Sequence, residues 1–294
     1  MSRIGIKCAV DGALVTDEMC LACRTGTPRA GRHCDYSYEM LAAMMDSSGR
    51  STAYVSASGT APVCARQDWL LEREDYHLDP AQGYMAARGT MSHNWLQSTP
   101  QPGAIYEQRF QIDVPGFPVP FTGQLDKFWA WSNWESEFYY DWEWEIDDLK
   151  SKQDSKLPEN EALRANIVQL NCYRYLLKYG SPQKRIDQDA FGTPLGYALV
   201  PGVPSNINVT RMKLSYFSMS RPKEIECPIL PESEVEAIIR QTMTDRLSHT
   251  IIPLKNLDPR KIFRDKETGL AKGFCHNWCP VRGACVRALL DEEE

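Results

Sequence analysis

Two aspartates and a lysine stand at a spacing that suits phosphoryl chemistry. Asp148 and Lys150 are two residues apart, and Asp126 lies in the segment before them. Two carboxylates held side by side repel each other unless a cation lies between them. Mg²⁺ or Mn²⁺, which takes one or two carboxylates and leaves its other positions to water and phosphate, is the natural occupant. A lysine beside such a cation can orient the attacking water and stabilise charge that develops on phosphorus.

The alternation of side chains makes the position of these charges unusual. In residues 138–146 every even position is apolar or aromatic, which is typical of a half-buried strand with its acids on the other face. Continuing the same period puts Asp148 and Lys150 on the apolar face, where an unpaired charge costs several kcal/mol. Groups placed at such a cost are usually ligands or catalysts. The alternative is a strand that ends at Ile146, with both charged residues on the surface.

A β-hairpin is the element that would bring the carboxylates together. Residues 121–150 have the composition of such a hairpin, and we expect its turn between Trp131 and Glu137. Residue 137 is the midpoint between Asp126 and Asp148. A turn centred there places the two acids directly across the strands from each other.

The rest of the chain is expected to alternate between helices and strands. Pro158 opens the clearest helix, which has apolar residues at spacings of three and four and ends before Gly180. Gln169 and Tyr173 share one face of it and could hold the lysine, a water or a nucleic-acid backbone, although such a pair is also common on an exposed face. The other expected elements are helices at 61–73, 80–97 and 232–248 and strands at 195–200 and 209–217, before a loop-rich C-terminus.

One ordered set of residues links these elements. It consists of His93, Gly123-x-x-Asp126, Asp148-x-Lys150 and Gln169-x-x-x-Tyr173. The set resembles the PD-(D/E)XK nuclease superfamily, in the branch of RecB-type and CRISPR-associated iron–sulfur exonucleases, and the resemblance covers residues 56–285. The second acid is Asp where many relatives have Glu, a substitution that the superfamily motif allows.

The resemblance implies both a fold and a set of roles. The fold is α/β, a restriction-endonuclease-like core with a central mixed sheet flanked by helices. The implied metal ligands are His93, Asp126 and Asp148, helped by the carbonyl of Leu149, and Lys150 assists the attacking water. Gln169 and Tyr173 belong to the same catalytic set.

Cysteines near the C-terminus form a second candidate site. Cys275, Cys279 and Cys285 have the spacing Cys-x₃-Cys-x₅-Cys and need a fourth ligand. A thiolate upstream would complete the ligation of a [4Fe–4S] cluster, and the run around Cys64 resembles the N-terminal cysteine motif of the same nucleases. Such a cluster would have a structural role, joining the beginning and the end of the fold. The usual spacing is Cys-x₂-Cys-x₅-Cys, so zinc and ordinary reduced cysteines remain alternatives.

The N-terminal segment has cysteines of its own, which the resemblance does not reach. Cys20-x₂-Cys23 is a good half-site for zinc, whereas the spacing to Cys8 and Cys34 is irregular. We expect residues 1–50 to form a Cys-rich extension that could bind Zn²⁺, with free thiols as the alternative. Ser- and Gly-rich connectors around residues 47–59 would separate it from a nuclease domain at 51–294.

Charge is distributed unevenly along the chain. The net charge of −6 argues mildly against a nucleic-acid binder. However, residues 135–148 hold seven acids and no Lys or Arg, and residues 178–223 have seven basic residues against two acidic ones. This pattern suits a cation site beside a phosphate track, or else two solvated faces of opposite sign. On the first interpretation Arg211 and Lys213 share one face of a strand and border the cleft that holds Asp126 and Asp148.

Composition limits the class of protein. The chain has 294 residues, 43% of them hydrophobic, which suits one large or two small globular domains. No apolar run approaches the roughly 18 residues that cross a bilayer, so we expect a soluble, cytoplasmic protein without membrane contact. Ten cysteines are too few for a disulfide scaffold and favour metal ligation.

The function expected from these patterns is metal-dependent cleavage of DNA. The protein would be an exonuclease acting on single strands or duplex ends in DNA repair, recombination or a CRISPR system, with a helicase, a recombinase or a CRISPR integrase as partner. A non-catalytic DNA-binding or scaffold protein that retains the nuclease fold is the main alternative. A zinc-stabilised interaction module would explain the cysteines but not the charges on the apolar face of the strand.

Overall fold

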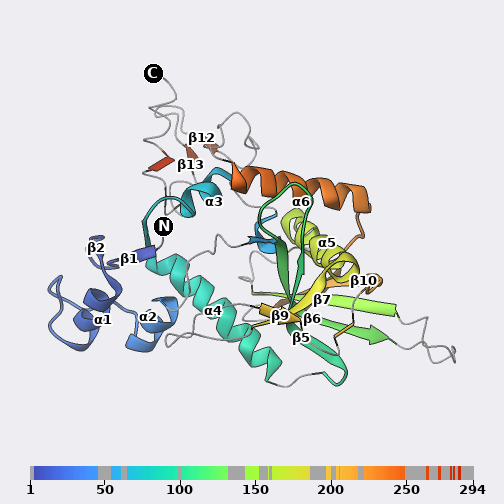
Figure 1. Cartoon of the computed structure of the whole chain (residues 1–294). Helices are drawn as coiled ribbons and strands as arrows, with labels where there is room; N and C mark the ends of the chain where they lie inside the picture. The colour runs from blue at the N-terminus through green and yellow to red at the C-terminus, as the bar shows by residue number, and fades with distance from the viewer. Residues whose placement is uncertain are drawn as a thin grey trace. The chain divides into compact units, whose positions relative to one another are not determined.

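The fold is described from a computed structural model (Figure 1). The described residues are 3–45, 54–60, 65–98, 101–131, 143–151, 158, 161–185, 197–199, 203–204, 206–217, 222–248, 263–264, 271–272, 279, 281 and 284–285. They belong to two compact units. One consists of Met1–Thr52, Val63–Met91 and Asp245–Glu294, and the other of Ala53–Pro62 and Ser92–Thr244.

The second unit is built on a mixed sheet. In its described part the strand order is β11-β10-β7-β6-β5-β8-β9, and β3 pairs with β6. Pairing is antiparallel except for β7 with β10 and β3 with β6, which are parallel. The strands are β3 (Val55–Ser56), β5 (Ala104–Ile112), β6 (Phe121–Trp131), β7 (Glu143–Ser151), β8 (Ser181–Arg185), β9 (Tyr197–Leu199), β10 (Val209–Phe217) and β11 (Pro222–Glu226).

Helices flank this sheet, which confirms the expected mixed α/β architecture with a central mixed sheet. Helix α5 (Arg164–Tyr179) packs on β6, and α6 (Glu232–Leu247) is joined to α5 by the ion pair of Lys178 with Glu232, at 2.5 Å. Helix α4 (Pro80–Gln97) brings its C-terminal end into the unit, preceded by the short 3₁₀ helix η1 (Ala57–Gly59) in the chain. The antiparallel pairing of β6 with β7 and the bounds of α4 and β10 are as predicted, and the expected turn between Trp131 and Glu137 lies outside the described residues. Helix α5 begins at Arg164 and not at Pro158, because Leu163 is still extended.

Gly123 allows α5 to approach the centre of the sheet closely. A Cβ atom at residue 123 would lie 2.7 Å from Cδ1 of Leu176 and 2.8 Å from Cδ1 of Tyr173. Leu176 is completely buried and Tyr173 is 4% exposed, so neither has free space to move into. The glycine of the Gly-x-x-Asp sequence therefore sets the distance between β6 and the helix that carries Gln169 and Tyr173.

We expect Gly123→Ala to lower the free energy of unfolding by about 1–3 kcal/mol, because the added methyl group overpacks this contact. Urea denaturation of the variant measures the change. Leu176→Ala, which removes the side chain nearest to the added methyl group, should be coupled favourably to Gly123→Ala in a double-mutant cycle. Unchanged stability of Gly123→Ala would show that α5 does not pack on β6 as described.

The described part of the first unit contains a three-stranded sheet, a two-stranded sheet, three short helices and the N-terminal part of α4. Its strands have the order β2-β1-β4, and its core groups Ile6 and Val15 with Leu41, Met44 and Ala87. The elements are β1 (Arg3–Lys7), β2 (Leu14–Val15), α1 (Asp17–Thr25), α2 (Tyr38–Met45), α3 (Ala65–Leu71), β4 (Tyr76–Leu78), β12 (Phe263–Arg264) and β13 (Ala271–Lys272). Because β1 pairs in parallel with β4, residues 1–50 do not stand apart, and the units divide the chain differently from the expected boundary near residue 50.

None of the described helices combines the length and the apolar character that crossing a bilayer demands.

Candidate functional site

The register of β6 and β7 places the two predicted carboxylates side by side. Lys127 pairs with Asp147 and Phe128 with Ile146, so the next position in this register sets Asp126 opposite Asp148. The backbone N–H of Leu149 donates a hydrogen bond of 2.8 Å to Oδ2 of Asp126. The predicted juxtaposition across the hairpin is confirmed.

Both carboxylates are removed from solvent. Asp148 is 1% exposed, and the side chain of Asp126 is 12% exposed. Burial, followed by the negative charge of Asp148, raises the pKa of Asp126 to about 8, although Lys150 and the N–H of Leu149 act in the opposite direction. At neutral pH the pair therefore retains a proton unless a cation displaces it.

Lys150 lies on the same side of β7 as Asp148. Its Nζ is 2.6 Å from Oδ2 of Asp148. Burial lowers the pKa of Lys150, but the charges of Asp148 and Asp126 outweigh that effect and raise the pKa above its usual value. The ammonium group is therefore charged. Within the described part of the chain neither oxygen of Asp148 makes a hydrogen bond of good geometry, so this buried carboxylate retains capacity for a further ligand.

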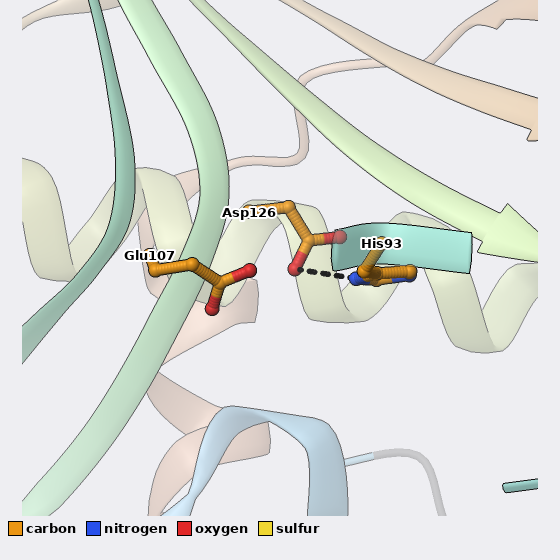
Figure 2. Close-up of side chains that lie close together, drawn as sticks. All are labelled: His93, Glu107 and Asp126. Atoms are coloured by element: carbon orange, nitrogen blue, oxygen red, sulfur yellow. Dashed lines mark ion pairs between the residues drawn. The ribbon is translucent and has the colours of Figure 1, made fainter. Parts of the chain in front are cut away.

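His93 and a third acid complete the cluster around Asp126 (Figure 2). Nδ1 of His93 is 3.7 Å from Oδ1 of Asp126, and its Nε2 is 2.9 Å from the carbonyl oxygen of Leu149. His93, Glu107 and Asp126 each offer one ligand atom within 4.8 Å of the others. Asp126 lies between the other two side chains in the figure. The backbone of Leu149 thus contacts two predicted ligands, through its N–H and through its carbonyl.

The sequence analysis did not identify Glu107 as a candidate ligand. It is an exposed residue of β5, and its Oε2 accepts a hydrogen bond of 2.5 Å from Nε2 of Gln124. Its φ angle of +50° is unusual for a non-glycine residue within a strand. Nothing in its immediate sequence signals that conformation, because Tyr106-Glu107-Gln108 reads as an ordinary strand segment.

The helix pair also lies at this site. Nε2 of Gln169 donates a hydrogen bond of 2.7 Å to Oη of Tyr173, as their spacing of four predicts. Burial, together with the charges of Asp148 and Asp126, raises the pKa of Tyr173 well above its ordinary value. Tyr173 therefore has a neutral hydroxyl, whose hydrogen-bond partner is Gln169.

The basic residues of β10 do not border this site, and that prediction is wrong. Arg211 pairs with Glu145 and Lys213 with Asp147 in the parallel register of β10 and β7, so both lie on the opposite face of the sheet from Asp148. There Nζ of Lys213 is 3.2 Å and Nη1 of Arg211 is 3.5 Å from the carboxylate of Glu145. They do share one face of the strand, as expected.

The acids on that opposite face are also not solvated, contrary to the expected half-buried strand. Glu145 is 1% and Asp147 3% exposed. Lys127 forms an ion pair with Asp147, with Nζ 3.5 Å from Oδ2, and Lys213 forms one with Glu145. Both faces of β7 are thus covered, because lysine and arginine side chains from β6 and β10 lie over its acidic positions.

The C-terminal cysteines are only partly described. Cys279 and Cys285 pack against a cluster of Leu70, Leu71 and Val281 in the first unit. Two of these three residues belong to α3, which begins at the residue after Cys64. Cys64 and Cys275 themselves lie outside the described residues. The described half of the predicted ligand set therefore packs against the C-terminal end of α3, the helix that begins at the residue after Cys64.

The N-terminal cysteines surround one pocket. Cys8, Cys20, Cys23 and Cys34 all line it, with His33 beside them. Burial, and then the neighbouring thiols of Cys34, Cys23 and Cys8, raise the pKa of Cys20 to about 11. Among the described residues, it is His93, Glu107 and Asp126 whose ligand atoms come within 4.8 Å of one another, not the sulfur atoms of this pocket.

Known proteins that resemble this chain assign no role to the site. Neither a protein family nor a curated protein matches the sequence. Among solved structures, the crystal structure of SSO0001 is similar, with a TM-score of 0.44 and 16% sequence identity over 70% of this chain and 84% of that chain. A likeness this distant identifies neither a fold family nor an activity. The fold and the site define a mixed α/β protein with an acidic and histidine cluster capable of holding a cation.

Proposed function

We propose that this protein is a metal-dependent DNA nuclease with a PD-(D/E)XK core. The observation that supports this most is the arrangement of Asp126, Asp148 and Lys150, two buried carboxylates across a hairpin with a lysine on the same face. Two carboxylates, an imidazole and a backbone carbonyl form a hard oxygen and nitrogen donor set, which suits Mg²⁺ or Mn²⁺. The free coordinating capacity of Asp148 and the raised pKa of Asp126 agree with a site built to hold a cation.

Each residue has a distinct role in this proposal. Asp126 and Asp148 hold the cation, with His93 and the carbonyl of Leu149 beside them. The cation supplies positive charge that stabilises the phosphoryl oxygens of the substrate. Lys150, which is charged and half-buried next to Asp148, orients the attacking water and stabilises developing negative charge. Tyr173 accepts a hydrogen bond from Gln169, which leaves its hydroxyl proton able to donate to the substrate.

The nature of the substrate rests on the ordered set of motifs. That set resembles nucleases that cleave DNA from its ends or as single strands, and a site made of charges and a cation reads phosphate rather than bases. We therefore propose an exonuclease with little sequence preference. The test is cleavage of labelled DNA by the purified chain with and without Mg²⁺ or Mn²⁺. Binding without cleavage would favour the alternative of a DNA-binding scaffold.

We further propose that Cys64, Cys275, Cys279 and Cys285 ligate a [4Fe–4S] cluster. The packing of Cys279 and Cys285 next to the helix that follows Cys64 supports a site joining these two parts of the chain. The role is structural, because ligation energy in such a site is folding energy. Zinc bound to the same four thiolates is the alternative.

Replacing Cys279 with Ser is expected to remove iron from anaerobically purified protein and to lower its melting temperature. Visible absorption and elemental iron analysis measure the first effect, and circular dichroism the second. Cys227→Ser, which changes a buried cysteine of the other unit, is the matched control and should retain iron. Full iron content in both Cys64→Ser and Cys279→Ser would contradict the ligand assignment.

A further inference from the structure

The pocket in the N-terminal part of the first unit gathers cysteines from three local structures. Cys8 is the first residue of the turn that follows β1. Two backbone hydrogen bonds close this turn: the N–H of Cys8 donates to the carbonyl of Ala13 at 2.8 Å, and the N–H of Gly12 donates to the carbonyl of Cys8 at 2.9 Å. Gly12 has a φ of +75°, a conformation that this tight turn requires. The turn fixes the direction in which Cys8 leaves the strand.

Helix α1 and the loop after it supply the other three thiols. Cys20 and Cys23 are three residues apart in α1 and therefore lie on one helix face. Cys34 lies in the segment between α1 and α2, and all four cysteines line the same pocket. Residues that are 26 positions apart in the sequence, Cys8 and Cys34, are thus brought to one place.

Basic groups surround the sulfur atoms, although Cys20 is a thiol in the metal-free protein because its pKa is raised to about 11. The backbone N–H of Arg29 donates to Sγ of Cys23 at 3.4 Å. The Arg29 side chain donates to Oδ1 of Asp11 at 2.6 Å, and its charge lies close enough to Cys8 to interact with that thiol. Lys7, Arg24 and Arg32 also line the pocket. Four basic side chains around four cysteines offset the negative charge that four thiolates carry.

The small core of this region gives a reason for a bound ion. Helix α1 contains no buried residue, and the described core here consists of Ile6, Val15, Leu41, Met44 and Ala87. Hydrophobic burial alone holds α1 weakly, since cores this small supply little stability. Ligation of a metal ion by residues of β1, α1 and the following loop would supply the missing energy.

We propose that this pocket binds one structural Zn²⁺ through Cys8, Cys20, Cys23 and Cys34. Thiolates select zinc over the hard cations expected at Asp126 and Asp148. Binding releases the four thiol protons to solvent and brings the sulfur atoms to about 2.3 Å from the ion. His33, whose buried Nδ1 has no hydrogen-bond partner among the described residues, lies next to the fourth ligand and is the natural residue to test against it.

Elemental analysis of the full-length chain tests this site independently of nuclease activity. We expect one zinc per chain, released stoichiometrically when a mercurial reagent titrates the thiols, and loss of that zinc in Cys23→Ser. Cys172→Ala, which removes a cysteine of the other unit, and His33→Ala should retain the zinc.

Cobalt substitution gives a readout that does not depend on the stability of the variants. Co²⁺ added to metal-free wild-type protein should show the visible bands and the sulfur charge-transfer absorption of tetrahedral thiolate ligation. The proposal fails if the folded wild-type protein contains no zinc and develops no such spectrum, or if Cys23→Ser keeps its full zinc content. Loss of zinc in His33→Ala but not in Cys34→Ser would overturn the assignment of the fourth ligand.

Discussion

Asp148→Asn is expected to reduce the rate of Mg²⁺- or Mn²⁺-dependent DNA cleavage by a factor of about 10² or more, because it removes a cation ligand at the reacting centre. Asp148 is 1% exposed and faces Asp126 across β6 and β7. The amide is close in size to the carboxylate, and Asp126 remains to balance the charge of Lys150. Single-turnover cleavage of end-labelled DNA measures the effect on the chemical step.

Asp147→Asn is the matched control for this experiment. It changes the adjacent residue of the same strand, also buried, but on the opposite face of the sheet and paired with Lys127. Burial raises the pKa of Asp147, so removal of its charge costs little, and cleavage should continue near the wild-type rate. Equal losses in both variants would indicate a general effect on the fold and not the loss of a ligand.

The second large effect is the dependence of stability on pH and on divalent cations. The carboxyl of Asp126 has a pKa of 3.8 in the unfolded chain and about 8 in the fold, mainly because of burial. Between these values the unfolded state releases the proton and the folded state keeps it, so the metal-free protein should lose stability as pH rises from about 4 to about 8. A cation competes with that proton, and its binding should tighten over the same range.

Asp126→Asn should remove both dependences. In chelator the variant is expected to melt above the wild type at about pH 8 and to differ less at about pH 5, because its amide does not ionise. Added Mg²⁺ or Mn²⁺ should raise the melting temperature of the wild type but not of the variant. Asp113→Asn, a change at an exposed aspartate, is the control. An identical cation response in the wild type and Asp126→Asn would remove Asp126 from the ligand set.

The central hairpin was predictable from two features of the sequence. Apolar and acidic side chains alternate along its second strand, and residue 137 is the midpoint between Asp126 and Asp148. The pairing of Lys127 with Asp147 confirms the register that centres on residue 137, and the contact of Gln169 with Tyr173 follows from helix geometry alone. In each case the distance between the residues is set by local backbone geometry. The sequence therefore contained enough information to place these side chains.

Contacts that depend on the order of distant strands were not predictable. Arg211 and Lys213 have the alternation expected of a phosphate track, but only the parallel pairing of β10 with β7 decides that they face Glu145. Glu107 joins His93 and Asp126 because β5 lies beside β6 and distorts at that residue. Neither fact has a local sequence signal.

Cleavage of DNA by the purified wild-type chain is the most direct test of the proposed function. Single-stranded and blunt-ended duplex substrates would be incubated with chelator and then with excess Mg²⁺ or Mn²⁺, in parallel with the Asp126→Asn, Asp148→Asn and Asp147→Asn variants. We predict cleavage from the ends that begins when the cation is added, is lost in the first two variants and persists in the third. Absence of cleavage with every substrate and either cation, or equal cleavage by the wild type and Asp148→Asn, would contradict a nuclease centred on these residues.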